Sequence, residues 1–453
     1  MKRLGEHAIV IGASMGGLLA ARALSDFYTA VTVLERDAFP TADTPRKGVP
    51  QGRHAHGLLA RGGAVLEEFF PGYNNEVVTQ SGGLRGDIAN DVAWIGHNVT
   101  LARGKSDLIG LAASRPVLEG HLRRRLLALP NVRAIENCAV QGLASDPARK
   151  SVTGVRAHVD GKQPETVDAD LVVDATGRGS SSAAWLAELG YQPPANEKME
   201  IGIGYVTRTY RRRPSDLEGK LGVIVAPSAP NWRSGVILAQ ENDSWIVSVG
   251  GFLGDDAPDN DQGFLAYLAT LPTMEIHDVV AKAEPLTDYD RYRYVSSLRR
   301  RYDKLARFPE NYLVFGDAIC SFNPVYAQGM TVAAQEAMAL RQCLRAGSND
   351  LARRFFKAAT KIVDISWDIA VGNDLRHPQV KGARPPMLHF INWYIGKLHL
   401  AATRDSTLAT AFLKVTNLMM PPTSLLSPAI ALRVWRGNRR PARNRFRRLR
   451  SKQ

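Results

Sequence analysis

The chain contains 453 residues, 45% hydrophobic and 23% charged, which is the composition of a globular protein with a large core and two or three domains. It has no run of about 18 apolar residues, no apolar signal segment at its start and only three, widely spaced cysteines, Cys138, Cys320 and Cys343. These features argue against a membrane-spanning protein, a disulfide framework and a metal site, and we expect a cytoplasmic protein.

The net charge of +14 is concentrated at the end of the chain. No Asp or Glu follows Asp405, whereas Lys414 and ten further Lys or Arg residues do, so 14 − 11 leaves about +3 for the rest. The folded body is therefore nearly neutral, and we expect no nucleic-acid partner. The basic segment 436–453 is predicted to be disordered. It is equally compatible with a solvated end and with contact to an anionic membrane.

The N-terminal part of the chain follows the order strand, turn, helix, strand. An apolar run at 8–11 predicts a buried strand, Gly12 breaks it, and residues 18–24 predict a helix directly afterwards. A second β-branched run, 31–34, ends on Glu35. This layout is typical of a unit that binds an adenine dinucleotide, with the pyrophosphate at the helix N-terminus and the ribose hydroxyls on the terminal acid.

The glycine fingerprint of such a unit is GxGxxG, and here Ser14 replaces its middle glycine. Gly12 would permit the tight turn, and Gly17 the close packing of helix on strand. The side chain of Ser14 is small enough either to donate to the pyrophosphate or to be tolerated beside it. The alternative is an ordinary strand–helix–strand unit without a ligand, but the strand, turn, helix and acid in register favour a binding site.

Three further elements of the first part of the chain are well marked. Ser114 can cap a helix that begins at Arg115. Residues 152–159 predict a strand, and Asp160-Gly161 predicts a two-residue hairpin after it. The apolar core at 171–173 predicts another buried parallel strand, closed by a glycine turn.

From about residue 200 to 300 the hydrophobic period is nearer to two than to 3.6, which predicts antiparallel strands with one wet face. A buried strand at 312–315 and a helix at 331–344 return to the first pattern, and residues 350–435 are mainly helical. The predicted fold class is α/β: a dinucleotide-binding parallel sheet, an inserted antiparallel-sheet domain for the substrate and a helical C-terminal region. We place the parts at 1–185, 186–304, 305–348, 349–435 and 436–453.

Three strand-to-glycine junctions occur along the chain, at Ile11-Gly12, Asp174-Ala-Thr-Gly177 and Phe315-Gly-Asp-Ala318. Their order and spacing resemble the FAD-dependent monooxygenases of the aromatic-hydroxylase and squalene-epoxidase type, over roughly residues 5–345. The loop Arg46-Lys-Gly-Val-Pro-Gln-Gly-Arg-His-Ala-His56 resembles most that of bacterial polyene epoxidases. The resemblance implies a glutathione-reductase-type FAD fold, FAD as cofactor, and NAD(P)H and O2 as co-substrates.

The resemblance also implies where FAD binds. The first motif would hold its adenosine end, and Asp317 would accept hydrogen bonds from the ribityl hydroxyls. The backbone from Gln328 to Thr331 would open a helix beside the flavin ring and stabilise negative charge on the reduced ring. No acid or base catalyst can be assigned. The residues expected to contact the cofactor are Gly12, Ser14, Met15, Gly16, Gly17, Glu35, Arg36, Arg46, Gln51, Arg115, Gly316, Asp317, Gln328, Gly329 and Met330.

Several positions depart from the family pattern. Ile319-Cys320 stands where the family has alanine and histidine, Ala327 replaces a glycine and Thr331 replaces an asparagine. These departures leave FAD binding intact but distance the chain from typical aromatic hydroxylases. His54 and His56 are as compatible with the entry of a helix as with a flavin contact.

The resemblance implies that NAD(P)H reduces the flavin, that O2 adds to it as a C4a-hydroperoxide, and that one oxygen atom passes to a double bond or ring of the substrate. We expect an apolar substrate of isoprenoid, polyene or polyketide-like type, because aromatic residues recur in the inserted sheet and at 387–395, although such spacing is more often core. The aromatic residues of the sheet are Tyr205, Trp245, Phe252 and Tyr267. The alternatives are a flavin-dependent reductase of isoprenoid double bonds and a non-catalytic lipid-cargo carrier on the same fold.

Overall fold

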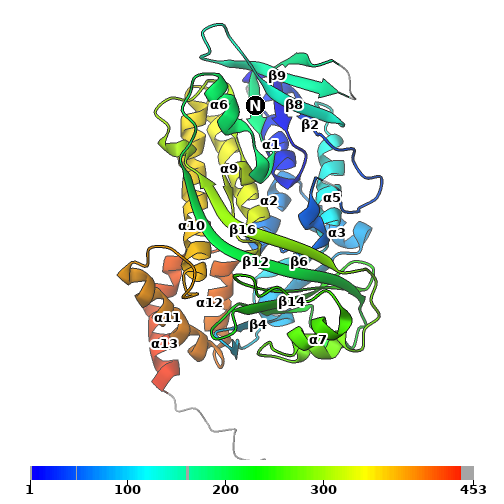
Figure 1. The fold of residues 1–453 in the computed structure, drawn as a ribbon, viewed down its shortest axis with the longest axis vertical. Coiled ribbons are helices and arrows are strands. Elements are labelled where there is room, and N and C mark those ends of the chain that lie inside the picture. The colour runs from blue at the N-terminus through cyan, green and yellow to red at the C-terminus, as the bar shows by residue number, and fades with distance from the viewer. Residues whose placement is uncertain (1–2, 47, 160–162, 440–453) are drawn as a thin grey trace, which may run out of the picture.

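The structure, a computed structural model, describes residues 3–46, 48–159 and 163–439 (Figure 1). At its centre lies a parallel sheet of order β17 (Tyr312–Val314), β11 (Leu171–Asp174), β1 (Gly5–Ile11), β2 (Tyr28–Leu34) and β7 (Val132–Ile135). In this sheet β11 and β17 and the carboxyl-terminal halves of β1 and β2 are buried, as expected where both faces are covered. The strands that the sequence predicts at 8–11, 31–34, 171–173 and 312–315 all belong to it.

Helices and a small second sheet enclose the parallel sheet. Helix α1 (Met15–Ser25) packs between its own strands and the helices α9 (Gly329–Arg345) and α5 (Arg115–Leu127). On the other side lies an antiparallel sheet of β8 (Cys138–Ser145), β9 (Val152–Val159) and β10 (Glu165–Asp168). The hairpin predicted at Asp160-Gly161 lies outside the described residues. The remaining helices of this half are α2 (Ala60–Phe69), α3 (Tyr73–Ser81), α6 (Ser182–Glu188) and α10 (Leu351–Asp374), whereas α4 (Ile88–Asp91) packs on the other half, against β4 (Val92–Gly96) and α12 (Ser406–Thr416).

A large sheet crosses below the parallel one and is antiparallel except where β13 pairs with β4 (Figure 1). This sheet confirms the antiparallel strands predicted for residues 200–300. Helices α7 (Asp261–Leu268) and α8 (Glu275–Val280) belong to the same part of the chain. The sheet order is β18 (Cys320–Ser321), β16 (Asp290–Arg300), β12 (Asn196–Arg211), β15 (Ser244–Gly251), β14 (Arg233–Gln240), β13 (Gly222–Val225), β4 (Val92–Gly96) and β5 (Val99–Thr100).

Two strands of the large sheet come from residues 92–100, far ahead of the segment 186–304 that we assign to the second domain. Next to them, β3 (Leu84–Asp87) and β6 (Ile109–Ala112) form a separate two-stranded ribbon. The large sheet is therefore built from chain segments on both sides of α5, and the chain crosses between the two sheets several times. These crossings bring the loops of both sheets together.

The C-terminal helices form a bundle with its own apolar core at one end of the molecule (Figure 1). They are α11 (Pro386–Ala402), α12 (Ser406–Thr416) and α13 (Pro428–Arg439). The prediction of disorder from residue 436 is wrong for 436–439, because Gly437 packs on Ala401 and Asn438 donates from Nδ2 to the Lys397 carbonyl at 2.9 Å. Residues 440–453 lie outside the described part. Among the helices described, none is both long and apolar enough to cross a membrane.

Candidate active site

The β1–α1 turn has the geometry that its glycines predict. Gly12 has φ +97°, and a Cβ atom there would lie 2.8 Å from the Ala175 carbonyl oxygen. A Cβ atom at Gly17 would lie 1.8 Å from the carbonyl oxygen of Gly12. No side chain fits at either position, so both glycines are required for helix α1 to begin so close to β1. The backbone of this turn faces an open cleft.

Glu35 lies at the end of β2, where the sequence predicts it, and is 5% exposed. Its Oε2 atom accepts from the Ala13 N–H at 2.8 Å and pairs with Arg46 Nη1 at 2.9 Å. Its Oε1 atom accepts from the Asp37 N–H at 3.1 Å. The carboxylate therefore holds the β1–α1 turn and the loop after β2 in one position, and it retains further acceptor capacity toward the cleft.

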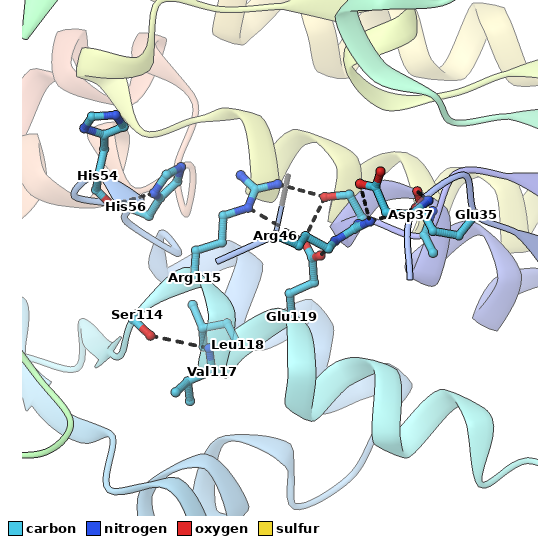
Figure 2. Close-up of polar contacts among 12 residues, drawn as sticks. Glu35, Asp37, Arg46, His54, His56, Ser114, Arg115, Val117, Leu118 and Glu119 are labelled. Carbon is cyan, nitrogen blue, oxygen red and sulfur yellow. Dashed lines mark hydrogen bonds and ion pairs between the residues drawn. The ribbon is translucent and has the colours of Figure 1, made fainter. Parts of the chain in front are cut away.

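Arg46 lies in a cluster of buried charges beside this turn (Figure 2). Its Nη2 atom pairs with Glu119 Oε1 at 3.0 Å, and Ser14 donates to Glu119 Oε2 at 2.7 Å. Arg115 donates from Nη2 to the Ser14 hydroxyl at 2.9 Å. Burial disfavours the charged form of Arg46, but the Glu119 and Glu35 carboxylates outweigh this and raise its pKa. The Ser14 hydroxyl thus bridges Glu119 and Arg115. The sequence predicts that it either donates to the pyrophosphate or is merely tolerated there, and the bridge is a third role.

Glu119 is the site residue that the sequence analysis missed. It is buried, and one carboxylate holds Arg46, Arg115 and Ser14. The available signal was its position four residues after Arg115 on a helix, which places both side chains on one face. The cap predicted for this helix is confirmed, since the Ser114 hydroxyl accepts from the Val117 N–H at 3.4 Å.

The third junction brings Asp317 into the same cleft. It lies in the short turn η5 (Gly316–Ala318), with its side chain exposed to the cleft and surrounded by protein behind it. Burial raises the pKa of Asp317, while the charges of Arg115 and Arg178 oppose this. Cys320, at one of the positions that depart from the family pattern, leads away from the cleft into strand β18 of the large sheet.

Glycines of the other two stretches lie close to Asp317. A Cβ atom at Gly177 would lie 3.9 Å from the Asp317 Cβ, and one at Gly329 would lie 3.5 Å from Asp317 Oδ1. Gly329 is the first residue of α9, two residues earlier than the predicted start of that helix. The three junctions that are far apart in the sequence therefore meet around one space.

That space is a cleft of about 590 Å³. Its residues fit FAD. The glycine turn at the N-terminus of α1 suits the pyrophosphate, and Glu35 suits the hydroxyls of the adenosine ribose. Asp317 suits the ribityl hydroxyls, and the start of α9 suits the electron-rich edge of the flavin ring. The Oε1 atom of Gln328, at the N-cap of α9, is buried and has no hydrogen-bond partner in the described structure. Of the fifteen expected cofactor contacts, Gly17 packs behind the turn, and the following line the cleft: Gly12, Ser14, Met15, Gly16, Glu35, Arg36, Arg46, Gln51, Arg115, Gly316, Asp317, Gln328, Gly329 and Met330.

A second cavity, of about 570 Å³ and mainly apolar, lies between the large sheet and helices α10 to α12. Of the four aromatic residues noted in the inserted sheet, Tyr205 and Phe252 line it, whereas Trp245 and Tyr267 are buried in the core of the sheet. The cavity and the cleft share a wall. This shared wall consists of Ala55, His56, Gly57, Tyr205, Pro324, Ala327 and Gln328.

The two histidines next to the shared wall have different roles. His54 is buried against the large sheet, where its Nδ1 atom lies 2.8 Å from the Thr207 hydroxyl and its ring meets Tyr205 edge-on. His56 lies in the shared wall itself. Burial lowers the pKa of His54 to about 4 and that of His56 to about 3, so both rings are neutral at neutral pH. His54 therefore positions the loop, and His56 lines both the cleft and the cavity.

This geometry defines a flavoprotein, and comparison with known proteins agrees with it. The chain belongs to the family described as FAD binding domain, whose model matches residues 6–354. Protein Rv3254 of Mycobacterium tuberculosis is 34% identical to it, over 97% of this chain and 96% of that protein. Kynurenine 3-monooxygenase of Salinispora tropica is 25% identical, over 83% of this chain and 82% of that enzyme.

Solved structures share the fold at low sequence identity. PqsL, a probable FAD-dependent monooxygenase from Pseudomonas aeruginosa, aligns with a TM-score of 0.61 and 17% identity, over 82% of this chain and 97% of that one. Family and site together identify the protein as a flavoprotein with FAD as its cofactor.

Proposed function

We propose that the protein uses NAD(P)H and O2 to hydroxylate or epoxidise an apolar small molecule bound in the second cavity. The observation that carries this proposal is the shared wall, because it places an apolar cavity directly beside the cleft that fits FAD. When bound, reduced FAD supplies the activation of O2. The cavity has room for a substrate of isoprenoid, polyene or polyketide-like size, since ligand pockets of this kind enclose about 300–1,000 Å³.

The residues of the shared wall would hold the flavin and keep water out. Gln328 and Gly329 open helix α9, whose free N–H groups and positive dipole end favour negative charge on a reduced ring. Pro324 and Ala327 cover the same side with apolar atoms, which limits the access of water. His56 is neutral and suited to a hydrogen bond rather than to charge stabilisation. Epoxidation of an alkene requires no side-chain base, in agreement with this set of residues.

We also propose that the C-terminal bundle contacts an anionic membrane surface, from which an apolar substrate enters. Helices α11 and α13 lie together at one end of the molecule, and they and the turn η7 (Pro422–Leu426) contain no Asp or Glu (Figure 1). Phe390 and Leu426 line the cavity and are also exposed, so the cavity reaches this face. The exposed apolar residues there, which we call the apolar face, are Met387, Phe390, Ile391, Trp393, Leu400, Met419, Met420, Leu426, Leu432 and Trp435.

The experiment that tests the reaction is anaerobic reduction of the purified protein with NADH or NADPH, followed by O2 and a candidate alkene or phenol. We expect bleaching of the flavin by at least one nicotinamide and a product heavier by one oxygen atom. A product heavier by two hydrogen atoms, formed without O2, would identify a reductase of double bonds instead. A purified protein without flavin that cannot be reconstituted would identify a cargo carrier.

The cofactor contacts are tested with the same preparation. Asp317→Ala should lose FAD on gel filtration while its circular dichroism stays unchanged, because a carboxylate binds ribityl hydroxyls more strongly than any neutral replacement. Asp278→Ala, an exposed carboxylate on α8, is the matched control and should retain FAD. Full retention of FAD by Asp317→Ala would refute the ribityl role.

A further inference from the structure

The second cavity is mainly apolar, and its one cationic side chain among the described residues lies beside the residues that follow α10 and the turn between β4 and β5. Arg376 lies there, two residues beyond the end of α10, and lines the cavity. Its guanidinium makes no ion pair in the part of the chain that the structure describes. Its polar neighbours are His97 Nδ1 at 3.4 Å and Asn373 Oδ1 at 3.5 Å, and it lies 5.9 Å from the centre of the Trp232 ring.

The contact with Arg376 determines the tautomer of His97. A guanidinium can only donate, so His97 Nδ1 accepts from it and the ring proton is on Nε2. Burial and the charge of Arg376 lower the pKa of His97 to about 3, which keeps the ring neutral. The Nε2–H group is buried and has no partner among the described residues. His97 therefore presents an unused donor in the wall of this cavity.

Trp94 supplies a second unpaired donor from strand β4. Its Nε1–H group is buried without a partner in the described structure, and its ring lines the cavity. A Cβ atom at Gly96, between Trp94 and His97 in the sequence, would lie 3.4 Å from Trp94 Nε1 and 2.8 Å from His399 Nε2. Unpaired buried donors are costly, at about 1–3 kcal/mol each, and two of them in the same cavity wall as a guanidinium without an ion pair require an explanation.

Neither carboxylate of the cavity wall neutralises this end. Asp91 accepts from the Asp87 N–H at 2.7 Å and from Asn90 Nδ2 at 2.8 Å, so both of its oxygens are engaged within its own turn. Asp368 lies about 12 Å from Arg376 along the helix direction, at 1.5 Å per residue. One end of the cavity therefore combines a positive charge with unpaired N–H groups and has no acceptor that satisfies them.

We propose that this end binds the carboxylate of an otherwise apolar substrate, with Arg376 as the ion-pair partner. The proposal rests on the proposed function only in that it takes the second cavity as the substrate site. A carboxylate neutralises the guanidinium and accepts its hydrogen bonds, and the unpaired N–H groups of His97 and Trp94 make the same part of the cavity favourable to acceptors. Anchoring one end of the substrate would determine which carbon atom faces the shared wall, and so where oxygen is inserted.

The test compares two probes that differ only in the head group, decanoate and decanol, bound to the FAD-loaded protein and measured by equilibrium dialysis. We expect the wild-type protein to bind decanoate at least tenfold more tightly than decanol. Arg376→Gln should bind both alike, with decanol affinity unchanged, and Arg376→Lys should keep part of the preference. Arg353→Gln, an exposed arginine on α10, is the matched control and should behave as wild type.

Equal affinity of the wild-type protein for the two probes, binding of neither, or a preference that survives in Arg376→Gln would each overturn the proposal. The assay needs no turnover, so its failure is distinct from failure of the proposed function. A protein that binds decanoate through Arg376 but never oxidises NAD(P)H would retain the carboxylate site and refute the monooxygenase reaction. Efficient oxygenation of substrates without an acid group would refute the carboxylate site alone.

Discussion

Glu336 is a fully buried carboxyl group on α9, beneath the turn that carries Asp317. Its Oε2 atom accepts from the Gly316 N–H at 2.7 Å, and its Oε1 atom has no partner in the described structure. Burial raises the pKa of Glu336 to about 8; the Gly316 N–H opposes this rise, and the charge of Asp317 adds to it. At neutral pH the group is therefore largely protonated, and it contributes an uncharged support to the GD turn.

Folding stability should depend on pH through this residue. Its pKa is 4.5 in the unfolded chain, so between about pH 4.5 and pH 8 the folded state holds a proton that the unfolded state has released. Stability contributed by Glu336 is full below this window and falls as pH rises through it, by at most about 1.4 kcal/mol per pH unit. Glu336→Gln, which mimics the protonated form, should melt near the wild-type temperature at pH 5 and above it at pH 8.

The control for this experiment is Glu188→Gln, an exposed residue on α6. Thermal melts followed by circular dichroism should show no pH-dependent gain for that variant. An equal difference between Glu336→Gln and wild type at both pH values would contradict the raised pKa. The experiment requires neither substrate nor turnover, so it reports on the site independently of the reaction.

The sequence predicts those site residues whose contacts lie within one short segment of the chain. Gly12, Gly17 and Glu35 could be predicted because strand, turn and helix follow one another within one short unit. Glu119 and its contact with Ser14 could not, because the two residues are 105 positions apart and the contact depends on how α5 packs on α1. Such long-range pairs of buried charges leave no periodic signal in the sequence.

At the scale of an element, the turn η6 (Pro324–Tyr326) is held by the last residue of α10. Asp374 is fully buried, and its Oδ1 atom accepts from Asn323 Nδ2 at 2.9 Å and from the Tyr326 hydroxyl at 2.8 Å. Pro324 belongs to the shared wall. Through its two hydrogen bonds, the Asp374 carboxylate therefore holds this part of the wall against α10. Asp374 is a positioning residue, because it holds the turn η6 and does not line the cleft or the cavity itself.

We expect Asp374→Ala to loosen this turn and admit water beside the flavin. The fraction of NAD(P)H oxidised to hydrogen peroxide rather than to product should then rise several-fold. The measurement is the ratio of peroxide to oxygenated product, with Lys361→Ala, an exposed residue on the same helix, as the control. An unchanged ratio in a variant that still binds FAD would show that the turn does not depend on Asp374.

The element that sequence analysis could not place is the pair β4 and β5. These strands are short, and their partner β13 lies about 130 residues later in the chain. Pairing at that separation depends on the whole fold, not on local pattern. Helix α9, with its clear period, was by contrast predicted to within a few residues.

At the scale of the whole molecule, the apolar face and the basic residues of the C-terminal bundle predict binding to anionic vesicles. Trp393 and Trp435 are 58% and 50% exposed, and burying such a ring in lipid is worth about 2 kcal/mol. We expect co-sedimentation with vesicles containing phosphatidylglycerol but not with pure phosphatidylcholine, and weaker binding at high salt. The double variant Trp393→Ser/Trp435→Ser should reduce binding about tenfold or more.

Val295→Ser is the matched control, since Val295 is equally exposed but lies on strand β16 of the large sheet. It should bind vesicles as the wild-type protein does. A protein that forms a dimer through the apolar face would instead show a concentration-dependent mass that the tryptophan variants abolish. Binding to neither type of vesicle would refute the membrane contact and leave the reaction unaffected.

The wall between the cleft and the cavity has an energetic consequence. Because Ala55, His56 and Gln328 contribute to both sides, a ligand on one side changes the contacts available on the other. Thermodynamic linkage requires the effect to be reciprocal: the factor by which FAD raises the affinity for substrate is the factor by which substrate raises the affinity for FAD. With positive coupling, an occupied cavity slows the loss of the cofactor, and conversion of the substrate removes that protection.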